Sequence, residues 1–209
     1  MFAIKNPVSS KVLSIAVISM IFASALSPLG APVAEAADTD FKNPTSNSQN
    51  GSGDSWNNAS NAYSNGSGSA SNPANDDRHR FAGFGISIPS GSTINGIEVV
   101  LDSWTDDNGG DCRIDVDLSW DNGSNWTSEK SADIGTSEAT QTLGNSSDDW
   151  RSGSWTPAEF SNFVVRVQAE DPNNDCDSND DIFLDWLRVK VYYTGGDTTA
   201  RRDQRRPCD

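Results

Sequence analysis

The sequence has little of what catalysis usually requires, since its 209 residues include a single histidine, His79. It contains no Gly-x-Ser-x-Gly elbow, and no cysteines or histidines at zinc-binding spacing. Its 30 acidic residues are so numerous that no carboxylate pair stands out as that of a glycosidase. We therefore predict a protein that is not an enzyme.

Basic residues are also scarce. The sequence has 15 Lys and Arg residues against 30 Asp and Glu residues, which gives a formal net charge of −15. Nucleic-acid binding needs basic side chains to neutralise phosphates, so the composition argues against a nucleic-acid partner. The acidity suits a soluble secreted protein, and it also suits calcium, which takes oxygen ligands. Acidity for solubility alone is the alternative.

Long hydrophobic runs are absent except near the N-terminus. Lys5 and Lys11 accompany an apolar stretch over 12–26, and Ala34-Glu35-Ala36 follows with small residues where a signal peptidase reads. The stretch is shorter than the roughly 20 residues of a membrane span. We expect residues 1–36 to be a signal peptide and the mature chain to be extracellular or at the cell surface, without a membrane span. An uncleaved anchor is the alternative.

Cysteine is limited to three positions, Cys112, Cys176 and Cys208. An exported chain can form disulfides. We expect Cys112, at the start of one predicted strand, to pair with Cys176, in the loop before another, and Cys208 to stay unpaired in the tail. Two reduced and unrelated thiols are the alternative.

Helical periodicity is missing beyond one turn at Thr156–Glu159, where Thr156 and Glu159 form a capping box around Pro157. Apolar and polar residues instead alternate with period two between Gly, Asn, Asp and Pro turns. The pattern predicts an all-β fold, an antiparallel β-sandwich of about seven or eight strands. The expected strands are 80–88, 94–101 with a bulge at Gly96, 112–120, a return strand from Trp126, short strands near Ile134 and Leu143, 163–169 and 182–193.

Composition divides the mature chain into three parts. Residues 37–53 are rich in Asn, Ser and Gly and are expected to be disordered, and 54–194 form the sandwich domain. Trp56 and Tyr63 should pin a loosely structured arm onto the domain. Residues 195–209 are expected to be a disordered, arginine-rich tail.

Five motifs stand out along the chain: WNNASNAYSNG (56–66), FGISIPSG (84–91), LSWDNG (118–123), WRSGSWTPAE (150–159) and LDWLRVKVYY (184–193). They resemble motifs of a jelly-roll-like β-sandwich module of secreted and surface proteins of bacteria and archaea. The resemblance spans roughly 55–194 and implies this fold, but it implies no particular ligand, because the function of the module is poorly defined.

Tryptophans are the first candidates for a binding site. Trp120 and Trp186 are in phase with apolar neighbours, so we expect them in the core. Four others lie at strand ends or in loops, where exposed aromatic faces can hold sugar rings; locking the loops onto the sandwich is the alternative. The four candidates are Trp104, Trp126, Trp150 and Trp155.

Two acidic loops are candidates for an irregular calcium site, because calcium takes six to eight oxygen ligands. The predicted disulfide would hold the loops side by side, whereas solvated loops without a metal are the alternative. The candidate ligands are Asp102, Asp106, Asp107 and Asp111 in the first loop, and Asp171, Asp175, Asp177, Asp180 and Asp181 in the second.

Together these features predict a secreted or surface module that binds a polysaccharide or a surface protein, as an adhesin does, with possible calcium stabilisation. One alternative is a subunit of a surface layer or filament, which self-associates when the polar N-terminal arm adds to a neighbour's sheet. The other is a spacer without a ligand.

Overall fold

The computed structural model describes residues 35–52, 54, 56–73, 76–108, 111–172, 176 and 180–196. The predicted signal peptide, apart from residues 35–36, and the tail from 197 onward with Cys208 lie outside the described residues. The strands are β1 (Ala36–Asp38), β2 (Ser46–Gln49), β3 (Ala70–Pro73), β4 (Arg78–Ala82), β5 (Ser92–Thr105), β6 (Arg113–Ser119), β7 (Lys130–Asp133), β8 (Ala139–Gly144), β9 (Val164–Glu170) and β10 (Asp181–Gly195), with 3-10 helices η1 (Ala59–Tyr63) and η2 (Pro157–Asn162).

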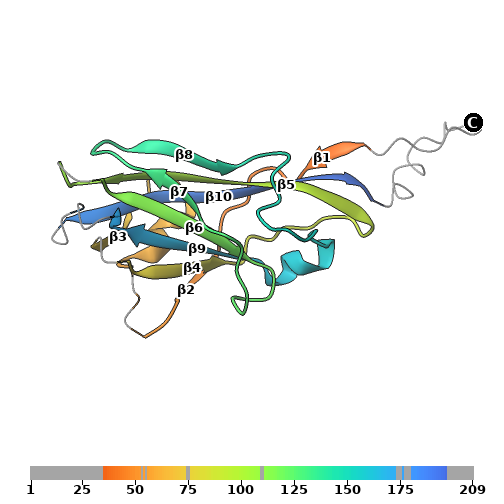
Figure 1. The fold of residues 1–209 in the computed structure, drawn as a ribbon, viewed down its shortest axis with the longest axis horizontal. Helices are drawn as coiled ribbons and strands as arrows, with labels where there is room; N and C mark the ends of the chain where they lie inside the picture. Colours follow the sequence, from red (N-terminus) through yellow and green to blue (C-terminus); the bar gives the residue numbers. More distant parts are fainter. Residues whose placement is uncertain are drawn as a thin grey trace, which may run out of the picture. The chain divides into compact units, whose positions relative to one another are not determined.

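Two antiparallel sheets form a sandwich (Figure 1). In one sheet the order is β3-β10-β5-β8, and β1 also pairs with β10; in the other it is β2-β4-β9-β6-β7. From β3 to β10 the chain passes back and forth between the sheets, and this connectivity is that of a jelly roll. The predicted fold class is confirmed.

The core follows the alternation read from the sequence. Ile114, Val116 and Leu118 of β6 are fully buried, as are Val165 and Val167 of β9. Each such side chain contributes about 1.5–3 kcal/mol by leaving water. The inner face of the sandwich is therefore set by the period-two pattern of these strands.

The other face of β6 is not exposed to solvent, although the alternation of apolar and polar residues predicts that it should be. Asp115 and Asp117 are 4% and 3% exposed. Arg113 forms an ion pair with Asp115, and Arg166 forms one with Asp117. Polar side chains thus cover this face of the sheet as a paired layer, because buried carboxylates need partners.

The longest strands, β5 and β10, pair over nearly their full lengths with two register shifts. At one shift, Gly96 pairs with Tyr192 but Ile94 pairs with Tyr193, so one residue of β5 has no partner on β10. The bulge predicted at Gly96 is therefore confirmed. A Cβ atom on Gly96 would lie 2.2 Å from the carbonyl oxygen of Asn145, so this position requires glycine.

The second shift inserts Asp185 between Leu184 and Trp186 of β10. It reverses the phase of the strand, so Trp186 is half-buried on the outer face, under Arg188 at 3.8 Å, rather than in the core as predicted. Asp185 is buried instead and accepts a hydrogen bond from the Gly66 amide at 2.9 Å. A one-residue insertion sends every later side chain to the opposite face.

Two predicted strands have different bounds in the structure. The stretch from 84 to 88 pairs with no strand, because β4 ends at Ala82 and Gly83 and Gly85 adopt positive φ angles of 75° and 62°. Phe84 is nevertheless buried against Phe163. The return strand after β6 begins at Lys130 rather than at Trp126.

The prediction of disorder over 37–53 is wrong for the described part of this segment. β1 pairs with β10, Lys42 forms a bridge to Val189, and β2 pairs with β4. The N-terminal segment from β1 to β2 thus lies along an edge of each sheet of its own chain. The prediction that the following segment is pinned by aromatics is confirmed, since Trp56 is buried and Tyr63 packs against the core.

Burial lowers the pKa of His79, which is 3% exposed and contacts Phe81, below its usual 6.5. The unfolded chain therefore binds a proton at this position more readily than the folded chain does. We expect the free energy of unfolding to fall as pH decreases below about 6.5. Between pH 7 and 5, the free energy of unfolding measured by urea titration should fall less for His79→Gln than for the native chain. An equal fall in the variant and the native chain would contradict this assignment.

Candidate functional site

A pocket of about 370 Å³ lies beside the end of β6. Trp120 directly follows that strand, and Trp126 follows the tight turn that comes next. Both indoles are half-buried, so each keeps apolar surface at the pocket. The pocket is lined by Trp120, Trp126, Thr127, Ser128, Arg151, Ser152 and Gly153.

The turn between the two tryptophans is fixed by Asp121. Its Oδ1 atom accepts hydrogen bonds from the amides of Ser124 at 3.1 Å and Asn125 at 2.8 Å. The hydrogen bond from the Asn125 side chain lowers the pKa of Asp121 most, and together with the two amide bonds it outweighs the opposing effect of desolvation. The Asp121 carboxylate thus caps the turn, and the cap fixes the spacing of the two indoles.

Trp126 rests on guanidinium groups that belong to the polar layer of the β6 sheet. The Cζ atom of Arg166 lies 4.1 Å from the ring centroid, and that of Arg80 lies 5.4 Å away. Arg166 also donates two hydrogen bonds to Asp117, where burial raises the pKa and the arginine opposes that rise. Trp126 is therefore supported from the sheet rather than by a mobile loop.

Arg151 forms a wall of the pocket beside Trp120 and is held by several partners. Its Cζ atom lies 4.6 Å from the Trp120 ring centroid and 4.5 Å from that of Trp155. It donates to the Gly153 carbonyl at 2.8 Å and forms an ion pair with Glu159 at 3.0 Å. The wall is thus fixed by contacts within the protein.

Glu159 links this wall to η2. The Thr156 amide donates to its Oε2 atom at 2.6 Å, and the predicted capping box is confirmed. Burial raises the pKa of Glu159, but the bonds from Thr156 and Arg151 outweigh burial and lower it. The carboxylate therefore stays charged and continues to orient Arg151.

Trp150 places the Arg151 wall by means of a strained backbone. Its φ angle of 67° lies in the left-handed region, which costs a bulky residue about 1–3 kcal/mol. Hydrogen bonds offset the strain: the Trp150 indole donates to the Ile97 carbonyl at 2.8 Å, and its amide donates to Asp148 at 3.0 Å. The loop is thus tied to β5, directly before it reaches the pocket.

Among the four predicted binding tryptophans, only Trp126 lines this pocket. Trp150 and Trp155 are 5% and 3% exposed and belong to the core, so the prediction of surface positions is wrong for both. Trp104 is half-buried and stacks on Phe183, with ring centroids 5.1 Å apart.

Trp120 lines the pocket, although its phase with apolar neighbours predicted a position in the core. The structure places it at the margin, half-buried and packed against the core. The turn signal at Asp121-Asn122-Gly123 already indicated that the strand ends at this tryptophan.

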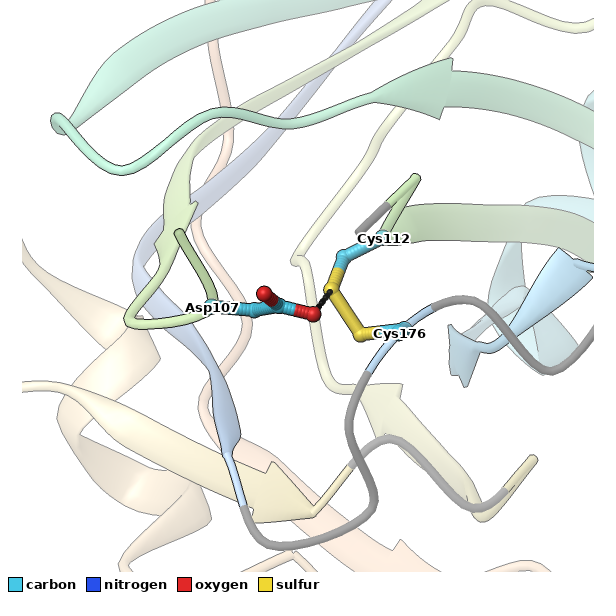
Figure 2. Close-up of side chains that lie close together, drawn as sticks. All are labelled: Asp107, Cys112 and Cys176. Atoms are coloured by element: carbon cyan, nitrogen blue, oxygen red, sulfur yellow. Dashed lines mark hydrogen bonds between the residues drawn. A yellow bond between two sulfur atoms is a disulfide. The ribbon is translucent and has the colours of Figure 1, made fainter. Parts of the chain in front are cut away.

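The two acidic loops meet at a disulfide between Cys112 and Cys176, the pairing expected from the sequence (Figure 2). Cys112 is fully buried and Cys176 is 3% exposed. Beside them lies the Asp107 carboxylate, with an oxygen 3.6 Å from the Cys112 sulfur. The disulfide therefore joins the first loop, directly before β6, to the second loop, where the chain approaches β10.

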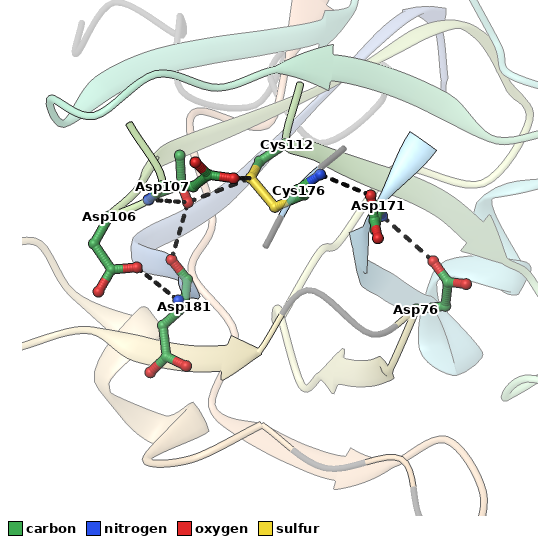
Figure 3. The surroundings of a disulfide bond; sticks show 8 residues. Asp76, Asp106, Asp107, Cys112, Asp171, Cys176 and Asp181 are labelled. Carbon is green, nitrogen blue, oxygen red and sulfur yellow. Dashed lines mark hydrogen bonds between the residues drawn. A yellow bond between two sulfur atoms is a disulfide. The ribbon is translucent and has the colours of Figure 1, made fainter. Parts of the chain in front are cut away.

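Carboxylates around the disulfide are hydrogen-bonded to the loop backbone (Figure 3). Asp106 accepts from the Asp181 amide at 2.6 Å, and Asp171 accepts from the Cys176 amide at 2.9 Å. These bonds stabilise the loop conformations.

Asp102 does not belong to the first loop, because β5 extends to Thr105. Its carboxylate is 6% exposed and accepts from Thr140 at 2.7 Å and Asn65 at 3.3 Å. Arg188 lies 3.8 Å away. Asp102 is therefore part of a polar network on the strands rather than a loop ligand.

The remaining calcium candidates are dispersed or lie outside the described residues. Asp111 is exposed and Asp180 is half-buried, whereas Asp175 and Asp177 fall outside the described residues. Within the described part of the chain, the one group of three acidic, cysteine or histidine side chains close enough to share an ion is Asp107, Cys112 and Cys176.

Comparison with known proteins gives no family-model match and no match among curated proteins. Among solved structures, the CBM36-1 domain of a multidomain xylanase from the hindgut metagenome of Trinervitermes trinervoides is 15% identical, with a TM-score of 0.40, and the match covers 78% of this chain and 100% of that domain. TmCBM61 in complex with β-1,4-galactotriose is 10% identical, with a TM-score of 0.32, over 75% of this chain and 86% of that one. With TM-scores below 0.5, these likenesses assign no ligand to this chain.

In the described part of the chain, no helix is long and apolar enough to cross a membrane.

Gly144 allows the close approach of Trp150 to β5. A Cβ atom at this position would lie 2.3 Å from the Ile97 carbonyl oxygen and 2.4 Å from the Trp150 indole nitrogen. We expect Gly144→Ala to lower the free energy of unfolding by more than the matched variant Gly85→Ala. Gly85 also has positive φ but open space around it, so its substitution should cost about 1–2 kcal/mol. Urea unfolding measures the free energy of unfolding of both variants, and an equal decrease in the two would contradict the proposed packing.

Proposed function

We propose that this domain is a non-catalytic carbohydrate-binding module of a secreted or surface protein, and that it binds saccharides in the pocket between Trp120, Trp126 and Arg151. The observation that carries the proposal is the convergence of two half-buried indoles on one pocket. Indole rings pack against the apolar C–H faces of sugar rings, and neighbouring polar groups bond the hydroxyls.

The polar lining suits this use. Ser128 and Ser152 contribute hydroxyl groups, and Arg151 contributes donors beside the aromatic walls. The arginine is already paired with Glu159, so it adds hydrogen-bonding capacity with little net charge. The pocket is therefore better matched to a neutral saccharide than to a strongly anionic one.

Rigidity supports the same proposal. The Asp121 cap fixes the turn between the indoles, and the strained Trp150 fixes the wall formed by Arg151. A site that is formed before binding loses little conformational entropy when the ligand enters. Strain retained beside a pocket is also typical of functional sites.

Trp126→Ala tests the pocket. We expect it to weaken binding of a neutral oligosaccharide about tenfold or more, because a truncated aromatic anchor typically costs over 1.4 kcal/mol. The ligand is first selected by screening the mature chain on β-glucan, xylan, galactan and a glycan array. Calorimetry then measures the affinity of each variant.

The matched control is Trp104→Ala, which removes another half-buried indole, one stacked on Phe183 outside the pocket lining. It should leave the affinity unchanged. Equal losses in both variants, or no binding to any saccharide in the screen, would contradict the proposal.

Calcium stabilisation of the acidic loops is a second part of the proposal. It is supported by the carboxylate content of loops that a disulfide holds together. We expect the thermal midpoint to rise in millimolar calcium and to fall in chelator, since a ligand of the folded state shifts its stability. Magnesium at equal ionic strength is the control, and an unchanged thermal midpoint in calcium would contradict calcium stabilisation of the loops.

A further inference from the structure

We propose that Asp107, Cys112 and Cys176 form a binding site for a thiophilic divalent cation such as zinc when the disulfide is reduced. The two acidic loops could then be joined either by a covalent bond or by a metal ion. This inference is independent of saccharide binding at the tryptophan pocket.

The geometry of the three side chains carries the proposal. Their ligand atoms all lie within 4.8 Å of one another, and all three residues are buried (Figure 2). Zinc binds sulfur at about 2.3 Å and carboxylate oxygen at about 2.0–2.2 Å, so one ion can bridge atoms at these separations. Small rotations of the two cysteine side chains would provide the room.

The chemistry of the ligands selects the metal class. Two thiolates and one carboxylate favour zinc over calcium, which prefers oxygen ligands alone. Two thiolates and one carboxylate carry three negative charges, and a divalent cation would offset most of them in a buried position. A water molecule can complete the tetrahedral coordination.

The neighbouring backbone keeps the carboxylate in position. Thr105 Oγ1 accepts a hydrogen bond from the Asp107 amide at 3.1 Å and donates one to the Asp181 carbonyl at 3.2 Å. It also lies 3.5 Å from the Cys112 sulfur. Thr105 ends β5 and Asp181 begins β10, so the site is attached to the two central strands of one sheet.

Loading the site requires a two-electron reduction, followed by proton release. A phosphine attacks the disulfide, and with one water molecule it yields two thiols and the phosphine oxide. Zinc then replaces the two thiol protons, which pass to solvent. The phosphine is suitable for the experiment because, unlike a dithiol, it does not compete strongly for the metal through sulfur.

The test uses the mature chain, phosphine-reduced and then titrated with cobalt(II) as a spectroscopic substitute for zinc. We expect one ion per chain, a sulfur-to-cobalt charge-transfer band and the visible bands of tetrahedral cobalt. Asp107→Asn should weaken binding about tenfold or more, since even the loss of a group that only orients a metal ligand costs about 10–100-fold in affinity. The matched control is Asp111→Asn, which removes an exposed carboxylate from the same loop and should bind cobalt as the native chain does.

Thermal unfolding of the reduced chain gives a second readout if reduction weakens the fold. Zinc should raise the midpoint of the reduced native chain, and it should leave the oxidised chain and a Cys112→Ser/Cys176→Ser variant unchanged. The proposal is overturned if zinc fails to stabilise the reduced chain, or if Asp107→Asn binds cobalt as tightly as Asp111→Asn. Saccharide affinity measured on the oxidised chain tests the pocket separately.

Discussion

The pairing of β5 with β10 is the interaction on which the remaining structure depends. These two strands form the centre of one sheet and fully bury the side chains of Leu101, Leu187 and Val189. Their register also contains two single-residue shifts. In antiparallel sheets such a shift reverses which face each later side chain occupies, so it decides which groups the strand pair presents to the core and which to solvent.

Each end of this strand pair supports one of the two candidate sites. Near the start of β5, Gly96 allows the backbone at Asn145 to approach closely. The Ile97 carbonyl accepts a hydrogen bond from the Trp150 indole, so the wall of the tryptophan pocket is tied to the sheet. At the other end, the acidic loops leave β5 and approach β10 beside the disulfide. Both sites therefore take their rigidity from the same pair of strands, although they lie at different ends of it.

The sequence was sufficient for properties that depend on local chemistry. Alternation identified the sandwich, the capping box at Thr156 and Glu159 was read correctly, and the Cys112–Cys176 pair was expected. The sequence was misleading where tertiary contacts override the local pattern. The insertion at Asp185 moves Trp186 to the outer face, and the hydrogen bond of Trp150 to Ile97 buries a tryptophan that local sequence places in a loop. Likewise, Asp107 and Cys176 become neighbours only through the loops, so no spacing rule predicts their cluster.

The central claim, that Trp120 and Trp126 together form a saccharide site, is tested most directly by NMR of the assigned indole N–H signals. The mature chain is titrated with the tightest-binding oligosaccharide. The signals of Trp120 and Trp126 should shift with a single binding constant, whereas those of Trp104 and Trp186, which also lie half-buried but outside the pocket, should stay in place. Shifts confined to Trp104 or Trp186, with Trp120 and Trp126 unmoved, would contradict the account.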